Sequence, residues 1–123
     1  MPTRSTEDVY KRQTWYYLKD SGAMATGWLK LGNTWYYLNA GGAMRTGWLF
    51  DNGSWYFLQG SGAMKTGWLQ QGSAWYYLKA SGAMATGWNW VNGKCYYFYE
   101  SGKMAQSTTV GGYRVDASGA WVK

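Results

Sequence analysis

Residues 26–44 read TGWLKLGNTWYYLNAGGAM, and nearly the same stretch returns at a step of twenty residues. The second copy, residues 46–64, is TGWLFDNGSWYFLQGSGAM, and the third, residues 66–84, is TGWLQQGSAWYYLKASGAM. A looser fourth copy, residues 86–104, is TGWNWVNGKCYYFYESGKM. A fixed period of this length is typical of solenoids and repeat arrays, in which each unit is too small to bury its own apolar face. The sequence therefore predicts a row of small units that depend on their neighbours.

Each copy predicts a β-hairpin. Residues 27–31 and 34–38 read as short strands around Gly32-Asn33, and the equivalent pairs in the later copies are Asn52-Gly53, Gly72-Ser73 and Asn92-Gly93. Asn-Gly favours a type I′ turn and Gly-X a type II′ turn, the two connections whose twist suits a two-residue loop. The segments between hairpins, such as residues 39–45, carry small residues and a glycine that permit a tight bend.

The two-residue loop also predicts which residues pair and which share a face. Lys30 should lie opposite Trp35, and Trp28 opposite Tyr37. Side chains alternate along a strand, so each hairpin has two faces. The face that we call aromatic carries Trp28, Lys30, Trp35 and Tyr37. The opposite face, which we expect to serve for packing, carries Leu29, Leu31, Tyr36 and Leu38.

The repeat fades at both ends of the chain. Residues 1–13 match none of it, so we interpret them as a leader or linker foreign to the array, which spans residues 14–105. The strand at residues 14–18 lacks the first half of its hairpin, and residues 7–11 are a candidate patch for this edge. Residues 106–123 predict a terminal cap, with a hairpin around Gly111-Gly112 and a final strand that contains Trp121.

The fourth copy differs in one informative way. Cys95 replaces the second tryptophan of the hairpin, and Trp90 stands where the first hairpin has Lys30. The pairing rule places Trp90 directly opposite Cys95. The tryptophan of this pair has therefore moved from the second strand to the first and still lies on the aromatic face.

Composition excludes several kinds of function. The chain has no histidine and one cysteine, which removes the common histidine-based nucleophile and metal sites and any disulfide within the chain. The net charge of +6 is spread singly along the repeats, which disfavours a nucleic-acid surface. No stretch is long and apolar enough for a membrane span. The six carboxylates are scattered, so no repeat offers an acid–base pair for catalysis. We expect no enzyme activity, metal or cofactor.

The aromatic face admits three interpretations. The first is structural, because aromatic cross-strand pairs hold together hairpins that are marginal alone. The second is a set of boxes for a quaternary ammonium. The faces of aromatic rings attract this cation, and because it has no N–H group it needs no carboxylate as a hydrogen-bond acceptor. The third is stacking against sugar rings, which also requires flanking polar groups. Asp51, Gln70 and Gln71, which could supply such groups, vary from copy to copy, and this slightly disfavours a sugar.

The repeat GWLKLGNTWYYLNAGGAMRTGW and its copies resemble the choline-binding, or cell-wall-binding, repeats of pneumococcal and related surface proteins. The ending TTVGGYRVDASGAWV resembles their carboxy-terminal closure, so the resemblance covers about residues 14–123. It implies an all-β, left-handed solenoid of stacked β-hairpins. It also implies that choline, carried by teichoic acids of the cell wall, is held between successive hairpins by three aromatic side chains and a methionine. The same superfamily includes glucan-binding and toxin oligosaccharide-binding repeats.

Carried onto this chain, the resemblance implies three complete boxes and a fourth that lacks its second tryptophan. Each takes both tryptophans of one hairpin, the next methionine, and the third ring of the following WYY group. The first set is Trp28, Trp35, Met44 and Phe57. The second is Trp48, Trp55, Met64 and Tyr77. The third is Trp68, Trp75, Met84 and Tyr97. The fourth contains Trp88 and Trp90.

The sequence thus predicts a non-catalytic module that binds choline on a bacterial surface polymer and works at the cell surface. Any export signal would lie outside this segment. The alternative is a module for α-glucan or another carbohydrate, and a purely structural stalk is the third possibility. The sequence does not specify the oligomeric state.

Overall fold

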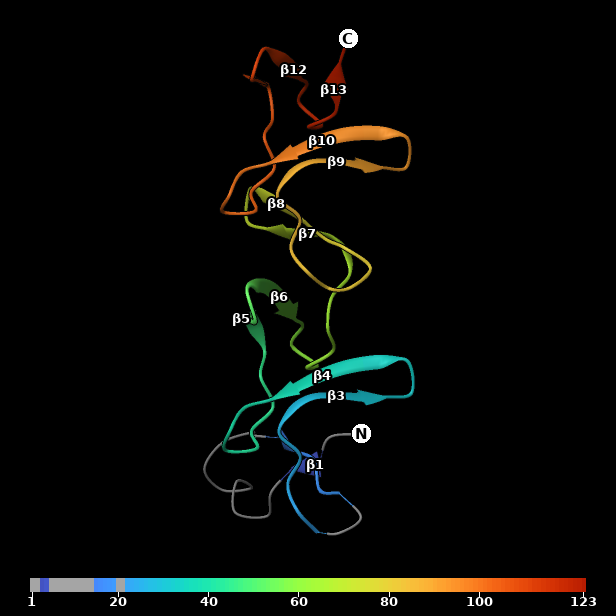
Figure 1. Cartoon of the computed structure of the whole chain (residues 1–123), viewed down its shortest axis with the longest axis vertical. Helices are drawn as coiled ribbons and strands as arrows, with labels where there is room; N and C mark the ends of the chain where they lie inside the picture. Colours follow the sequence, from blue (N-terminus) through green and yellow to red (C-terminus); the bar gives the residue numbers. More distant parts are fainter. Residues whose placement is uncertain (1–2, 5–14, 20–21) are drawn as a thin grey trace. The chain divides into compact units, whose positions relative to one another are not determined.

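The structure is a computed structural model that describes residues 3–4, 15–19 and 22–123, and these residues form only strands and turns (Figure 1). No helix long and apolar enough to cross a membrane occurs among them. Eight strands form the four repeat hairpins: β3 (Gly27–Leu31), β4 (Thr34–Leu38), β5 (Gly47–Asp51), β6 (Ser54–Leu58), β7 (Gly67–Gln71), β8 (Ala74–Leu78), β9 (Gly87–Val91) and β10 (Lys94–Phe98). The terminal strands are β1 (Thr3–Arg4), β2 (Trp15–Tyr16), β11 (Thr108–Val110), β12 (Tyr113–Val115) and β13 (Trp121–Val122).

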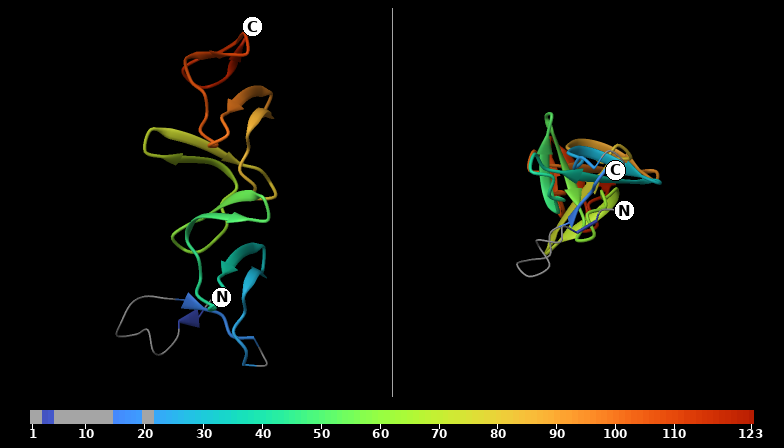
Figure 2. Two further views of the ribbon diagram at one scale, coloured as in Figure 1. Left: turned by 60° about the vertical axis from the view of Figure 1, so that its left-hand side comes forward. Right: turned by 90° about the horizontal axis from the view of Figure 1, so that it is seen from below.

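The chain divides into two compact units, residues 1–65 and 66–123. The first unit contains three two-stranded sheets, β1–β2, β3–β4 and β5–β6. The second contains the β7–β8 and β9–β10 hairpins and a three-stranded sheet in the order β11–β12–β13. Within each unit, successive hairpins belong to separate sheets and point in different directions (Figure 2). No continuous sheet therefore joins the described hairpins to one another; side-chain packing and single backbone hydrogen bonds, such as that from the Met64 amide to the Trp35 carbonyl, do so.

The hairpins have the predicted register. In the first, Lys30 pairs with Trp35 and Trp28 with Tyr37, and the same offsets recur in the other three. The turns also agree with their sequences. Asn52 and Gly53 both have positive φ, at 49° and 87°, as a type I′ turn requires. At Gly32-Asn33 the glycine has a φ of 64° and is the only one of the two with positive φ, as in a type II′ turn.

A second recurring device closes each repeat. The last residue of the second strand forms a bridge with the methionine six positions later, as in Leu38–Met44, Leu58–Met64 and Phe98–Met104. The amide of Gly42 donates to the Asn39 carbonyl, so the chain reverses tightly between the bridged residues. The bridging Leu38, Leu58, Leu78 and Phe98 are fully buried and form the centre of the packing.

The two ends of the chain depart from the repeat, and some of these departures were predicted. The hairpin around Gly111-Gly112 is present, and β13 with Trp121 adds to its β12 edge. At the other end, β2 pairs with β1, so Thr3 and Arg4 supply the missing strand. The candidate patch at residues 7–11 lies outside the described residues. The predicted class, an all-β array of hairpin repeats, is confirmed, whereas the left-handed winding stays a prediction.

Candidate ligand-binding site

In the first unit, three rings from two successive hairpins meet. Trp28 lies edge-on to Trp35, with ring centroids 6.3 Å apart and an interplanar angle of 86°. Tyr56 of β6 contacts Trp28 at 5.0 Å and 68°. The backbone amide of Met64 donates to the Trp35 carbonyl over 2.8 Å, which brings this methionine beside the second tryptophan. We call Trp28, Trp35, Tyr56 and Met64 the Trp28 box.

The second unit repeats this arrangement forty positions later. Trp68 lies 6.2 Å from Trp75 at 85° and 4.9 Å from Tyr96 at 77°. The amide of Met104 donates to the Trp75 carbonyl over 2.8 Å. Trp68, Trp75, Tyr96 and Met104, which we call the Trp68 box, line a pocket of about 420 Å³ whose remaining lining residues are Gln106, Ala117 and Ser118. None of its lining residues carries a charge.

The ring of the next hairpin that contacts the first tryptophan differs from the ring named in the predicted sets. The predicted sets drew it from the aromatic face, at Phe57 and Tyr97. In the structure, the rings beside Trp28 and Trp68 are Tyr56 and Tyr96, which lie one residue earlier and therefore on the packing face. Phe57 and Tyr97 instead contact Trp48 and Trp88 of their own hairpins, each at 5.1 Å. Within each unit, the packing face of one hairpin thus lies against the aromatic face of the hairpin before it.

The predicted methionines also take other places. Met44 forms a bridge with Leu38 and packs on Gly62, and Met84 forms a bridge with Leu78 and packs on Gly102. The methionines beside the second tryptophans are Met64 and Met104, one repeat further along. The predicted tryptophan pairs Trp28–Trp35 and Trp68–Trp75 are brought together. Whether Met44, Met84, Phe57 and Tyr97 touch a ligand stays a prediction.

The second predicted set draws on both units. Trp48, Trp55 and Met64 belong to the first unit and Tyr77 to the second. Trp55 is 42% exposed and lies 5.1 Å from Phe50. Tyr77 contacts Trp68 of its own hairpin at 5.1 Å. This box stays a prediction.

Charged groups distinguish the Trp28 box from the Trp68 box. The indole N–H of Trp28 donates to the Asp51 carboxylate over 3.0 Å, which fixes the orientation of this ring. The Lys30 ammonium lies over the Trp35 ring, 5.8 Å from its centroid. Forty positions later, the counterparts of Asp51 and Lys30 are the uncharged Val91 and Gln70. The two boxes therefore have the same kinds of rings in the same arrangement, and they differ in the charged groups around them.

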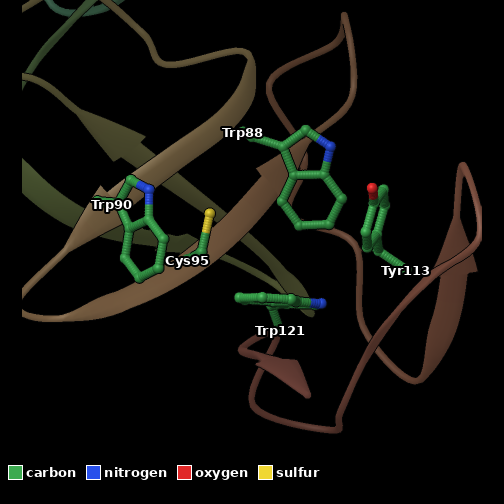
Figure 3. A pocket seen from close by; sticks show the side chains of 5 residues that line it. All are labelled: Trp88, Trp90, Cys95, Tyr113 and Trp121. Atoms are coloured by element: carbon green, nitrogen blue, oxygen red, sulfur yellow. The ribbon is translucent and has the colours of Figure 1, made fainter. Parts of the chain in front are cut away.

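A further pocket lies at the carboxy-terminal end of the second unit, where Trp88, Trp90, Cys95, Tyr113 and Trp121 surround about 200 Å³ (Figure 3). We call it the terminal pocket. It contains both members of the predicted fourth set, Trp88 and Trp90. The prediction missed Tyr113, Trp121 and the lining role of Cys95. Tyr113 and Trp121 are aromatic residues that do not follow the twenty-residue period, and this was the sign of a different role in the sequence. Their partners could not be assigned by counting in steps of twenty.

The comparisons with known proteins agree with this architecture. Profiles described as choline-binding repeat match residues 8–45, 25–66 and 45–86, and a second such profile matches residues 88–121. The chain therefore belongs to the choline-binding repeat family. A search of curated proteins found no match.

Solved structures of pneumococcal proteins are similar. CbpJ from Streptococcus pneumoniae TIGR4 is 58% identical with a TM-score of 0.87, over 89% of this chain and 38% of that one. Choline binding protein F from Streptococcus pneumoniae, solved in the presence of a peptidoglycan analogue, is 48% identical with a TM-score of 0.89, over 99% of this chain and 39% of that one. The pneumococcal cell wall endolysin from phage Cp-1, complexed with choline, is 37% identical with a TM-score of 0.65, over 85% of this chain and 30% of that one. The chain thus spans less than two fifths of the length of each.

Proposed function

We propose that this chain is a non-catalytic module that binds choline groups of a bacterial cell-wall polymer of the teichoic-acid type. The observation that carries the proposal is the recurrence of one box, with two tryptophans, a tyrosine and a methionine, at Trp28 and again at Trp68. The relative solved with choline and the relative solved with a peptidoglycan analogue support this ligand and this location. Attachment at the cell surface follows from the proposed polymer.

The chemistry of the Trp68 box favours a quaternary ammonium. Its walls are ring faces and a thioether, and no carboxylate lines it. A primary ammonium would leave N–H donors without a strong acceptor, whereas a trimethylammonium group has none to satisfy. Each desolvated ring contributes about 2 kcal/mol at best, so three rings, less the cost of immobilising the ligand, give an affinity of about millimolar to high micromolar.

The polar groups beside this box support choline over a sugar. The Gln106 amide donates to the Ala117 carbonyl over 3.0 Å, and the Ser118 hydroxyl donates to Asp116 over 2.6 Å. These groups hold the terminal turn together. Sugar recognition needs polar groups presented to several hydroxyls, and here one donor of each side chain is used within the protein.

Two carboxylates have structural partners, which supports a binding role rather than a catalytic one. Asp51 accepts the Trp28 indole N–H, and Asp116 accepts the amides of Ser118 and Ala120. The described residues contain no group of three or more potential metal ligands.

The proposal is tested by titrating tryptophan fluorescence and near-UV circular dichroism with choline chloride. We expect a saturable change at about millimolar choline, shared by tetramethylammonium and absent with sodium chloride. Trp75→Ala should remove the part of the change that arises from the Trp68 box. Gln70→Ala is the matched control, because Gln70 pairs with Trp75 but does not line the pocket. A response to soluble dextran alone would move the module to the glucan-binding alternative, and silence with every ligand would leave the rings as packing.

A further inference from the structure

Two groups of opposite charge lie at the tryptophans of the Trp28 box. The carboxylate of Asp51, the last residue of β5, accepts the Trp28 indole N–H over 3.0 Å. The Lys30 ammonium lies 5.8 Å from the centroid of the Trp35 ring, within the distance at which an aromatic face attracts a cation. A negative group therefore lies beside one tryptophan of this box, and a positive group lies beside the other.

These charges are not needed to bring two tryptophans together. In the Trp68 box, forty positions later, Val91 stands at the place of Asp51 and Gln70 at the place of Lys30. The tryptophan pairs of the two boxes nevertheless have nearly the same geometry, with ring centroids 6.3 Å apart at 86° in one and 6.2 Å apart at 85° in the other. The charges of the Trp28 box are therefore free to serve recognition.

Lys30 is poorly suited to a ligand that is only a cation. The Trp35 ring is 38% exposed and so is open to a ligand, but Lys30 lies directly opposite it in the hairpin. Two like charges close to one ring repel each other. A ligand with an anion beside its quaternary ammonium reverses this balance, because the lysine attracts the anion while the rings hold the trimethylammonium group.

We infer that the Trp28 box is selective for a zwitterion, a trimethylammonium group joined to an anion, and that Lys30 is the residue that determines this selectivity. Asp51 positions the Trp28 ring and adds a negative charge at the end of the box away from the lysine's ring. The inference rests on the proposed function, since it assigns a form of ligand to one of the proposed boxes. The two boxes then hold trimethylammonium groups with different preferences for what is attached to them.

Two kinds of ligand share this chemistry. A choline phosphodiester carries its anion on the phosphate, and glycine betaine carries it on a carboxylate nearer to the nitrogen. Glycerophosphocholine is the probe for the first kind and glycine betaine the probe for the second. Acetylcholine is the control, because it is an ester of choline without an anion.

The indole N–H signals of the ten tryptophans give a separate reading of each box by NMR. We define the selectivity of a box as its dissociation constant for choline divided by that for glycerophosphocholine. At low salt, Lys30→Gln should lower the selectivity read from Trp28 and Trp35 by roughly twofold to fivefold, the effect of one exposed ion pair. The effect should shrink at high salt, because Lys30 is exposed. The corresponding ratio for acetylcholine should not change.

Three further variants test the assignment to this residue. Lys30→Arg keeps the positive charge and should keep the selectivity. Gln70→Lys, the matched change opposite Trp75, should raise the selectivity of the Trp68 box. Asp51→Asn leaves an amide oxygen that can accept the Trp28 indole N–H, so it should change the affinities for both ligands by a similar factor. A larger loss of selectivity with Asp51→Asn than with Lys30→Gln would overturn the role of Lys30.

The outcomes separate this inference from the proposed function. If Trp28 and Trp35 saturate with choline, and Lys30→Gln changes the selectivity for neither zwitterion, the inference is overturned and the proposed function stands. If glycine betaine alone depends on the lysine, the zwitterion site stands and its anion is a carboxylate. If no indole signal saturates with any trimethylammonium ligand, the proposed function fails as well.

Discussion

Lys30 places a fixed cation at the ring that a ligand cation would use. Its ammonium lies 5.8 Å from the centroid of Trp35. A like charge at this distance should oppose choline in the Trp28 box, so Lys30→Gln should raise the affinity of that box by roughly twofold to fivefold. The gain should shrink as salt is added, because the lysine is exposed. Indole NMR titrations at low and high salt measure it.

The matched variant, Gln70→Lys, introduces a lysine at the same position of the Trp68 box. Gln70 holds the same register position opposite Trp75. Gln70→Lys should therefore lower the choline affinity of the Trp68 box by a similar factor. Equal affinities for wild type and both variants at low salt would show that this position does not tune the boxes.

Variants at Tyr96 and Tyr97 test which ring of the fourth hairpin forms a wall of the Trp68 box. Tyr96 lies 4.9 Å from Trp68, whereas Tyr97 contacts Trp88 of its own hairpin. Tyr96→Leu should weaken choline binding at Trp68 and Trp75 by about tenfold, and Tyr97→Leu should leave it nearly unchanged. Thermal unfolding of each variant controls for lost packing. The reverse order of effects would restore the wall predicted from the aromatic face.

At the scale of the element, the bend that closes each repeat requires glycine. Gly62 has a φ of 90°, and a Cβ there would run into the Met44 sulfur. Gly62→Ala should destabilise the first unit by roughly 1–3 kcal/mol through backbone strain and displacement of Met44. Urea unfolding measures the change. Gly60→Ala is the control, because a Cβ at Gly60 meets nothing within 4 Å, and a loss of stability as large as that of Gly62→Ala would contradict the explanation.

The terminal turn should be sensitive to acid. The Ser118 hydroxyl, together with the amides of Ser118 and Ala120, lowers the pKa of Asp116 below its usual 3.8. A carboxyl whose pKa is lowered on folding stabilises the fold above its unfolded pKa, and this contribution is lost as the pH falls through the folded pKa. Hydrogen exchange at Ser118 and Ala120 should therefore accelerate relative to the intrinsic rate below about pH 4.

Asp116→Asn provides the comparison for that pH series. The variant cannot titrate at this position, so protection at Ala120 should be weaker at neutral pH and should lose most of its acid dependence. An unaltered acid dependence in Asp116→Asn would assign the effect to another group.

At the scale of the whole molecule, repetition should convert weak sites into firm attachment. A polymer that displays many choline groups engages several boxes, and each further contact forms at high effective concentration. Trp35→Ala and Trp75→Ala each disable one box, and the double variant disables both. On a choline-displaying matrix, we expect the free choline needed for elution to fall with each substitution, most steeply in the double variant. Elution of all variants at the same choline concentration would show that one site carries the attachment.

The sequence by itself determined the hairpins, their turns, their register and the exchange of Trp90 and Cys95. These features are local, because a two-residue loop sets the pairing and alternation then assigns each side chain to a face. The tryptophan pairs of the Trp28 and Trp68 boxes follow from that alternation.

Only the tertiary structure decided which side chains lie against the tryptophans of the aromatic face. Tyr56 and Tyr96 belong to the packing face, yet they contact Trp28 and Trp68, because the back of one hairpin lies against the aromatic face of the preceding one. Tyr113 and Trp121 reach the terminal pocket from strands outside the repeat. How one hairpin packs on the next depends on contacts between residues more than twenty positions apart, and the alternation within a single hairpin carries no information about them.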